Sequence, residues 1–138
     1  MKNVAKPGIS PETNETTLTN ASKEAVMHHL SSFVDNDLES VLSDYTDESV
    51  LITQGGTYTG LRQIRSFFTP LMAHFPKQFT SFTLDKFVAE EDFVYIVWHA
   101  KTPTLDVQLG SDTFVLKNNK IYQQTYVSRL TELHPVDC

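Results

Sequence analysis

The sequence predicts an α+β fold in which a cone-shaped, curved antiparallel sheet wraps over three N-terminal helices. Two observations predict this class. Apolar residues recur at helical spacing up to about residue 75, whereas the alternating pattern of strands occupies residues 79–130. Residues 44–68 join the two regions through the end of a helix, a short strand, a glycine-rich turn and a new helix. One helical layer on one sheet encloses a single core, so we expect one domain at residues 19–133.

The two ends of the chain are expected to lie outside this domain. Residues 1–18 are polar and contain two prolines and a glycine, which predicts a flexible N-terminal tail. Residues 134–138 form a short C-terminal tail. The start of the chain lacks the apolar centre of a secretory signal, and the one cysteine, Cys138, allows no internal disulfide. We therefore expect a reducing, cytoplasmic location.

Composition excludes several classes of partner. The chain has 138 residues, a formal net charge of −6 and a pI of about 5.2, and its basic residues form no run, so we expect no nucleic acid partner. Its apolar runs are shorter than the roughly 18 residues of a membrane span, so we expect no membrane partner. A phosphate-binding loop and a dinucleotide fingerprint are both missing, and we expect no cofactor.

The helices are expected in the first half of the chain. Thr19 or Asn20 caps the first, and Asn36 caps the second, with Glu39 three residues later as in a capping box. The third runs from Gly60 to about residue 74. Pro70 lies inside it and should kink or restart the helix, because proline lacks the amide hydrogen, and the preceding threonine could cap the restart.

Five strands are expected, at residues 49–54, 79–89, 93–101, 105–117 and 121–130. Gly110 indicates a bulge or bend within the fourth. Asn118-Asn119 indicates a hairpin turn, because asparagine tolerates positive φ. A two-residue turn would pair Asp112 with Thr125, whereas a three-residue loop would pair Asp112 with Gln124. We expect the three-residue form, which turns Gln124 and Tyr126 towards the pocket.

Several short stretches resemble the nuclear transport factor 2-like superfamily, which includes ketosteroid isomerase and the SnoaL-like polyketide cyclases. The matching stretches are Phe33-Val34-Asp35, Asp37-Leu38-Glu39, Tyr45-Thr46-Asp47-Glu48-Ser49-Val50, Gly60 with Ile64 and Phe67-Phe68, Asp112-Thr113-Phe114 and Lys120-Ile121. The resemblance covers about residues 21–130. It implies a cystatin-like α+β barrel with a hydrophobic pocket inside the cone, and a homodimer.

The resemblance also implies candidate catalytic residues. The oxyanion aspartate of the isomerases and the acid–base aspartate of the cyclases both fall on Asp112. The histidine that the cyclases carry one strand earlier falls on His99. The isomerase base falls on Thr53, which cannot act as a carboxylate base, and the isomerase tyrosine falls near His29 or Leu30. The pattern of the cyclases is therefore the better match, with Asp112 and His99 as its catalytic pair.

The register implied by the family places alternate residues of two neighbouring strands inside the cone. They are Phe93, Tyr95, Val97 and His99 on one strand, and Gln108, Gly110, Asp112, Phe114 and Leu116 on the next. The expected ligand-binding residues are His29, Thr53, Tyr58, Tyr95, Val97, Phe114, Gln124 and Tyr126. Among such aromatic neighbours we expect burial to raise the pKa of Asp112. The opposite face, with Val94, Ile96 and Trp98, is expected to form the dimer contact.

Two functions follow from these expectations. The first is a SnoaL-like pocket protein that binds a small, mainly apolar or aromatic ligand, with isomerase-like or cyclase-like acid/base chemistry at Asp112. The alternative is a non-catalytic dimeric module for ligand binding or protein interaction, with a small or filled pocket. In the second case Asp112 makes a structural hydrogen bond, and His29 and His99 are packing residues. A zinc site of His29, His99 and Asp112 has suitable ligand types but no spacing motif.

Overall fold

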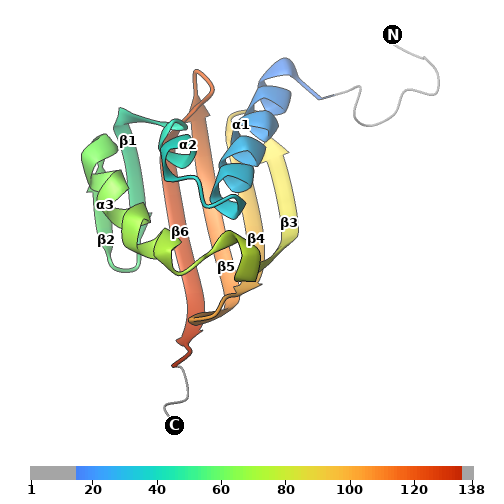
Figure 1. The fold of residues 1–138 in the computed structure, drawn as a ribbon. Coiled ribbons are helices and arrows are strands. Elements are labelled where there is room, and N and C mark those ends of the chain that lie inside the picture. Colours follow the sequence, from blue (N-terminus) through green and yellow to red (C-terminus); the bar gives the residue numbers. More distant parts are fainter. Residues whose placement is uncertain (1–14, 135–138) are drawn as a thin grey trace, which may run out of the picture.

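In the computed structural model, which describes residues 15–134, three α-helices cover one face of an open six-stranded sheet (Figure 1). The helices are α1 (Thr17–Val34), α2 (Leu38–Leu42) and α3 (Gly60–Ala73), followed by a short 3-10 helix, η2 (Lys77–Phe79). The strands are β1 (Tyr45–Thr53), β2 (Gly56–Thr59), β3 (Ser81–Glu90), β4 (Phe93–Lys101), β5 (Leu105–Lys117) and β6 (Lys120–Glu132). The expected α+β class is confirmed. Within the described range, no helix is long and apolar enough to cross a membrane.

The sheet is mixed rather than wholly antiparallel, in the order β2-β1-β6-β5-β4-β3. Strands β3 to β6 form the expected antiparallel meander, whereas β1 lies parallel to β6. The glycine-rich turn after β1 belongs to a hairpin whose second strand, β2, was not expected. Strand β1 also begins four residues earlier than expected. Its first residue, Tyr45, is buried and pairs with Ile121 of β6.

The observed helix caps differ from the expected ones. Helix α1 is capped by Thr16, whose Oγ1 accepts a hydrogen bond from the backbone N–H of Thr19 at 2.9 Å. Thr19 is not the cap because it lies inside the helix, where its hydroxyl accepts a hydrogen bond from the backbone N–H of Glu91. The expected boundary at residue 18 thus falls within α1. The rest of the two expected tails, residues 1–14 and 135–138, lies outside the described residues.

The second helix is capped by Asp37 instead of Asn36, and its carboxylate accepts from the N–H of Ser40. Asn36 adopts the left-handed conformation, with φ 56°. Its amide donates to the backbone oxygens of Met72 and Phe75 at 2.7 and 2.6 Å. Asn36 therefore joins the α1–α2 corner to the end of α3, a contact between residues far apart in the sequence.

Helix α3 continues through Pro70, so the expected restart does not occur. The hydroxyl of Thr69 donates to the backbone oxygen of Arg65 one turn earlier, in place of capping a new helix. Gly60 begins the helix at φ 84°, where a side chain would lie 3.2 Å from the backbone oxygen of Asp47. Glycine is thus required at this corner by both the backbone angle and the available space.

Gly110 of β5 makes room for the indole of Trp98. The two residues pair directly across β4 and β5, and a Cβ on Gly110 would lie 2.2 Å from Trp98 Cε2. The bulge expected at Gly110 lies two residues earlier, where Gln108 is an extra residue of β5 relative to both neighbouring strands. The close approach of backbone and indole, rather than a bend, explains glycine at this position.

We predict that Gly110→Ala destabilises the protein by about 2 kcal/mol, because the added methyl group must displace the buried indole of Trp98. Urea denaturation followed by circular dichroism measures the change. Gly55→Ala is the matched control, since the nearest atom to its added Cβ is Thr53 Oγ1 at 3.9 Å. Equal midpoints for the two variants would contradict the close packing of Trp98 on Gly110.

Candidate functional site

A cavity lies between the helices and the concave face of the sheet. Its volume is about 40 Å³. The lining is mainly apolar and consists of His29, Leu30, Phe33, Phe67, Phe68, Leu71, Phe82, Ile96, Trp98, Asp112, Phe114, Gln124 and Tyr126. A protein cavity of roughly 150 Å³ accommodates benzene, so an aromatic ligand requires this cavity to widen.

The central polar group of the cavity is the carboxyl of Asp112 on β5, which is buried. Its Oδ1 accepts a hydrogen bond from Trp98 Nε1 at 2.8 Å, and its Oδ2 accepts from Gln124 Nε2 at 2.8 Å. The hydroxyl of Tyr45 in turn donates to Gln124 Oε1. Each carboxyl oxygen thus has one neutral donor, and two of the roughly four lone-pair sites of the carboxylate remain free for another partner.

Burial raises the pKa of Asp112 to about 6, while the hydrogen bonds from Trp98 and Gln124 oppose this rise. The raised pKa was expected, but of the expected neighbours only Phe114 lies beside the carboxyl, and Ile96 and Trp98 take the place of the others. Ile96, Trp98 and Phe114 surround the carboxyl on the concave face. Asp112 consequently changes between a hydrogen-bond acceptor and an acid close to neutral pH, which suits a group that exchanges protons.

His29 contributes the second titratable side chain of the cavity. It comes from α1 and is 4% exposed, and its ring makes T-shaped contacts with those of Tyr45, Phe68 and Phe114 at centroid distances of 5.7, 5.9 and 5.5 Å. Burial, assisted by the neighbouring charge of His28, lowers the pKa of His29 to about 4. The imidazole is therefore neutral at physiological pH, so one of its nitrogens donates a hydrogen bond and the other accepts one, depending on the tautomer.

An aromatic stack forms one wall of the cavity. The indole of Trp98 lies between the rings of Phe82 and Tyr126, at centroid distances of 5.2 and 6.2 Å and interplanar angles of 25° and 11°. The hydroxyl of Tyr126 donates to Ser128, so Tyr126 presents its ring to the cavity. Phe82 is partly buried, whereas Trp98 is buried.

Five of the expected site residues line the cavity: His29, Asp112, Phe114, Gln124 and Tyr126. The last two do so through an unexpected register. Asn118 and Asn119, with φ of 53° and 64°, form a two-residue turn in which Lys117 pairs with Lys120. Tyr122 is then an extra residue of β6, and this bulge pairs Asp112 with Tyr126 and Phe114 with Gln124. The expected three-residue loop was wrong, but the bulge turns the same residues inwards.

The expected placement of Phe93, Tyr95, Val97 and His99 in the cone was wrong. Asp112 pairs across the sheet with Ile96, so the even-numbered residues of β4 point inwards and the odd-numbered ones outwards. His99 is exposed, and its Nδ1 lies 2.6 Å from Asp85 Oδ2 on the outer face. His99 therefore cannot act with Asp112 on one ligand, and the zinc alternative fails because its three ligands do not converge. In residues 15–134 no other cluster of three such side chains could hold a metal ion.

Two more expected residues lie outside the cavity. Thr53 ends β1, and its Oγ1 bonds with Gly55 and Gly56 in the β1–β2 turn. Tyr58 of β2 packs its ring on that of Phe67, at a centroid distance of 5.1 Å, outside the cavity lining. Both positions shape the β1–β2 hairpin that flanks α3.

Sequence reasoning missed Trp98, Ile96 and the helical wall of the cavity. The helical wall was recognised only as apolar stripes, and such a stripe does not show whether a side chain packs in the core or borders a cavity. The residues concerned are Leu30, Phe33, Phe67, Phe68 and Leu71. Trp98 and Ile96 were assigned to the outer face because β4 is apolar on both faces. A signal for Trp98 was available in Gly110, the one position on β5 that leaves space for an indole.

Comparison with known proteins gives a consistent answer for the fold. The family of SnoaL-like domains matches residues 26–124 of this chain. An NTF2-like protein of unknown function from Mesorhizobium loti superposes with a TM-score of 0.69 and 13% identity, over 84% of this chain and 97% of that one. An LEH-like epoxide hydrolase from M. tuberculosis superposes with a TM-score of 0.66 and 16% sequence identity, over 80% of this chain and 84% of the hydrolase. TerC, crystallised with polyporic acid, superposes with a TM-score of 0.62 and 17% sequence identity, over 79% of this chain and 92% of TerC. No curated protein sequence matches the chain.

We predict that the two buried groups of the cavity make opposite contributions to stability between pH 4 and 6. The pKa of Asp112 rises on folding from 3.8 to about 6, so its stabilising contribution is complete below pH 3.8 and falls as pH rises to 6. The pKa of His29 falls from 6.5 to about 4, so its contribution is complete above pH 6.5 and is lost as pH falls to 4. Each amounts to about 3 kcal/mol, and together they nearly cancel.

Single substitutions should reveal each contribution. In Asp112→Asn the free energy of unfolding should rise by about 3 kcal/mol from pH 4 to pH 6.5, relative to the wild type, because only His29 remains. In His29→Gln it should fall by a similar amount over this range. Urea denaturation at both pH values gives these differences. Parallel pH profiles for the wild type and both variants would show that neither group has a shifted pKa.

Proposed function

The chain belongs to the family of SnoaL-like domains, and from this premise we propose that it binds a small, mainly apolar or aromatic ligand in the cavity beside Asp112. In this proposal Asp112 is the acid/base group of an isomerase-like or cyclase-like proton transfer, and His29 is its polar partner. Trp98, Phe114, Gln124 and Tyr126 supply the remaining contacts. A cytoplasmic location stays part of the proposal, on the strength of the single cysteine.

One observation carries the proposal: a carboxyl is buried in an apolar cavity with a pKa of about 6. Burying an ionised carboxyl among apolar groups costs much more free energy than burying an uncharged polar side chain. Shifted carboxyls of this kind occur most often at functional sites. The names of two structural neighbours, an epoxide hydrolase and a protein crystallised with polyporic acid, support a ligand-binding role for this fold.

Ligand entry requires the cavity to widen, and Phe82 is the residue placed to allow it. A surface hollow of about 160 Å³ lies next to the cavity and is lined by Phe33, Val34, Phe75, Thr80 and Phe82. Phe33 and Phe82 border both spaces. If the ring of Phe82 turns away from Trp98, the joined space exceeds the roughly 150 Å³ that accommodates benzene.

The small volume of the cavity favours a second candidate function. A space of about 40 Å³ is well below the 300–1,000 Å³ typical of drug-sized ligand sites. A non-catalytic dimeric module, in which Asp112 is a structural hydrogen-bond acceptor for Trp98 and Gln124, also fits this geometry. Binding of a small aromatic probe distinguishes the two functions.

We propose that the protein forms a homodimer through the outer face of the sheet. The expected contact residues Val94, Ile96 and Trp98 are buried inside the protein, so that basis for the dimer was wrong. The outer face instead exposes large apolar side chains on five strands, and each of them is 40–49% exposed to solvent. They are Ile52, Val88, Phe93, Leu109 and Val127. Large apolar side chains exposed together on one face of a sheet support an interface there.

We predict that toluene binds weakly to the wild type and at least about tenfold more tightly to Phe82→Ala, because this substitution joins the cavity to the neighbouring hollow. The readout is the indole N–H signal in two-dimensional ¹H–¹⁵N NMR spectra. Trp98 is the only tryptophan of the chain and borders the cavity, so this signal is unambiguous. Phe79→Ala, at a phenylalanine that is 70% exposed, is the matched control and should bind as the wild type does. No shift in either the wild type or Phe82→Ala would favour the non-catalytic module.

We also predict that the wild type sediments as a dimer at micromolar concentration and that Val127→Asp sediments as a monomer, because a charge on the outer face opposes burial. Sedimentation velocity gives the result directly. Leu18→Asp is the matched control, since Leu18 lies on α1 at 48% exposure, against 49% for Val127. A monomeric wild type would rule out this interface.

A further inference from the structure

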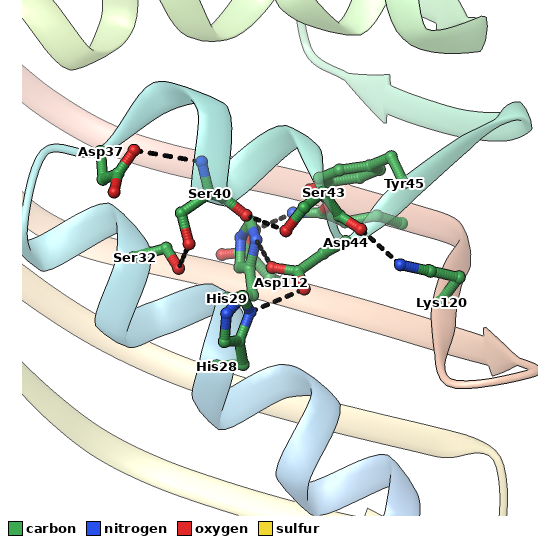
Figure 2. Close-up of polar contacts among 11 residues, drawn as sticks. His28, His29, Ser32, Asp37, Ser40, Ser43, Asp44, Tyr45, Asp112 and Lys120 are labelled. Carbon is green, nitrogen blue, oxygen red and sulfur yellow. Dashed lines mark hydrogen bonds and ion pairs between the residues drawn. The ribbon is translucent and has the colours of Figure 1, made fainter.

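A second polar cluster lies on the helical side of the cavity, around Asp44 (Figure 2). Asp44 is buried at the junction of α2 and β1. Its Oδ1 lies 2.7 Å from Nδ1 of His28, a side chain that is half exposed on α1. Its Oδ2 faces Nδ1 of the next residue, His29, at 3.8 Å. The cluster thus connects the protein surface with a residue that borders the cavity.

Two atoms of this cluster lack partners although they face one another. Within residues 15–134, neither His29 Nδ1 nor Asp44 Oδ2 has a hydrogen-bond partner, and both atoms are buried. A buried polar atom left unpaired costs about 1–3 kcal/mol. A shift of about 0.8 Å would bring this pair to normal hydrogen-bond distance. The two atoms are complementary only if Nδ1 carries a hydrogen, because an ionised carboxylate accepts and cannot donate.

We propose that Asp44 is a positioning residue that fixes the hydrogen of His29 on Nδ1, so that Nε2 accepts a hydrogen bond from a hydroxyl group of the ligand. The ligand class is thereby narrowed to small aromatic or apolar molecules with a phenolic or enolic hydroxyl. This inference rests on the proposed function, since it concerns the ligand of the same cavity.

The surroundings of His29 support this assignment. The groups packed on the imidazole from α3, β1 and β5 are the rings of Phe68, Tyr45 and Phe114, and the hydroxyl of Tyr45 is already bound to Gln124. Nδ1 points to Asp44, which leaves Nε2 as the nitrogen available to the cavity that His29 lines. With a pKa of about 4, the ring is neutral and Nε2 keeps its lone pair at pH 7.5.

The second polar group of the cavity imposes the same preference. At pH 7.5, well above its pKa of about 6, Asp112 is ionised, and its free lone pairs only accept hydrogen bonds. At pH 7.5 both His29 and Asp112 therefore offer acceptors to a ligand. A ligand hydroxyl can donate to either of these acceptors, whereas a ligand whose only polar group is a carbonyl offers them no hydrogen.

The tautomer of His29 can be read without any ligand, from the ¹⁵N chemical shifts of its imidazole nitrogens at pH 7.5. His29→Gln identifies the signals by their loss. We expect the Nδ1–H form in the wild type and a shift towards the Nε2–H form in Asp44→Asn, whose amide can donate to Nδ1. Asp85→Asn, which changes the surface pair of Asp85 with His99, is the matched control and should leave His29 unchanged. If Asp44→Asn does not fold, the wild-type tautomer still decides, and a predominant Nε2–H form overturns the inference.

The ligand class is tested with 4-methylphenol and toluene, which differ by one hydroxyl, using the indole signal of Trp98. We expect 4-methylphenol to bind at least about tenfold more tightly than toluene in the wild type and to lose this advantage in Asp44→Asn. Equal affinities in the wild type overturn the hydroxyl preference. If neither probe binds while His29 is in the Nδ1–H form, the proposed function fails and the positioning role of Asp44 stands.

Discussion

The arrangement of the sheet depends on the burial of one carboxyl group. Asp112 is buried among apolar side chains, and its oxygens accept hydrogen bonds from Trp98 on β4 and Gln124 on β6. Gln124 in turn accepts from Tyr45 on β1. These residues come from the four central strands of the sheet, in the order β1-β6-β5-β4, so the chain of hydrogen bonds crosses the centre of the sheet. A buried carboxyl without hydrogen-bond partners would cost much free energy. The register of all four strands is therefore constrained to place these donors next to Asp112.

The same contacts explain why the cavity is narrow and aromatic. The indole of Trp98 reaches Asp112 only because Gly110 leaves space beneath it, and the indole is then held between Phe82 and Tyr126. This stack forms one wall of the cavity. The remaining space is small, and burial shifts the pKa of His29 and that of Asp112 in the direction that favours the uncharged form of each.

The sequence was sufficient to predict the fold class, the limits of β4 and β5, and the burial of Asp112 and His29, because periodicity and turn residues are local signals. The register was not predictable by counting, since bulges change it. The pairing of Lys101 with Asp106, continued without a bulge, would place Asp112 opposite Tyr95. The extra residue Gln108 moves Asp112 opposite Ile96, which turns His99 and Tyr95 to the outside. Asp44 was missed because its role depends on contacts between α1 and the α2–β1 junction that no local pattern encodes.

The central claim is that Asp112 is a buried acid that changes its protonation near neutral pH. Its most direct test is an NMR titration of the Asp112 carboxyl carbon, with Asp112→Asn to identify the signal. A midpoint near pH 6, accompanied by a change in the Trp98 indole signal at the same pH, is the predicted result. A midpoint at or below about 3.9, the value of a free aspartate, would contradict the claim and remove the reason for placing a functional site in this cavity.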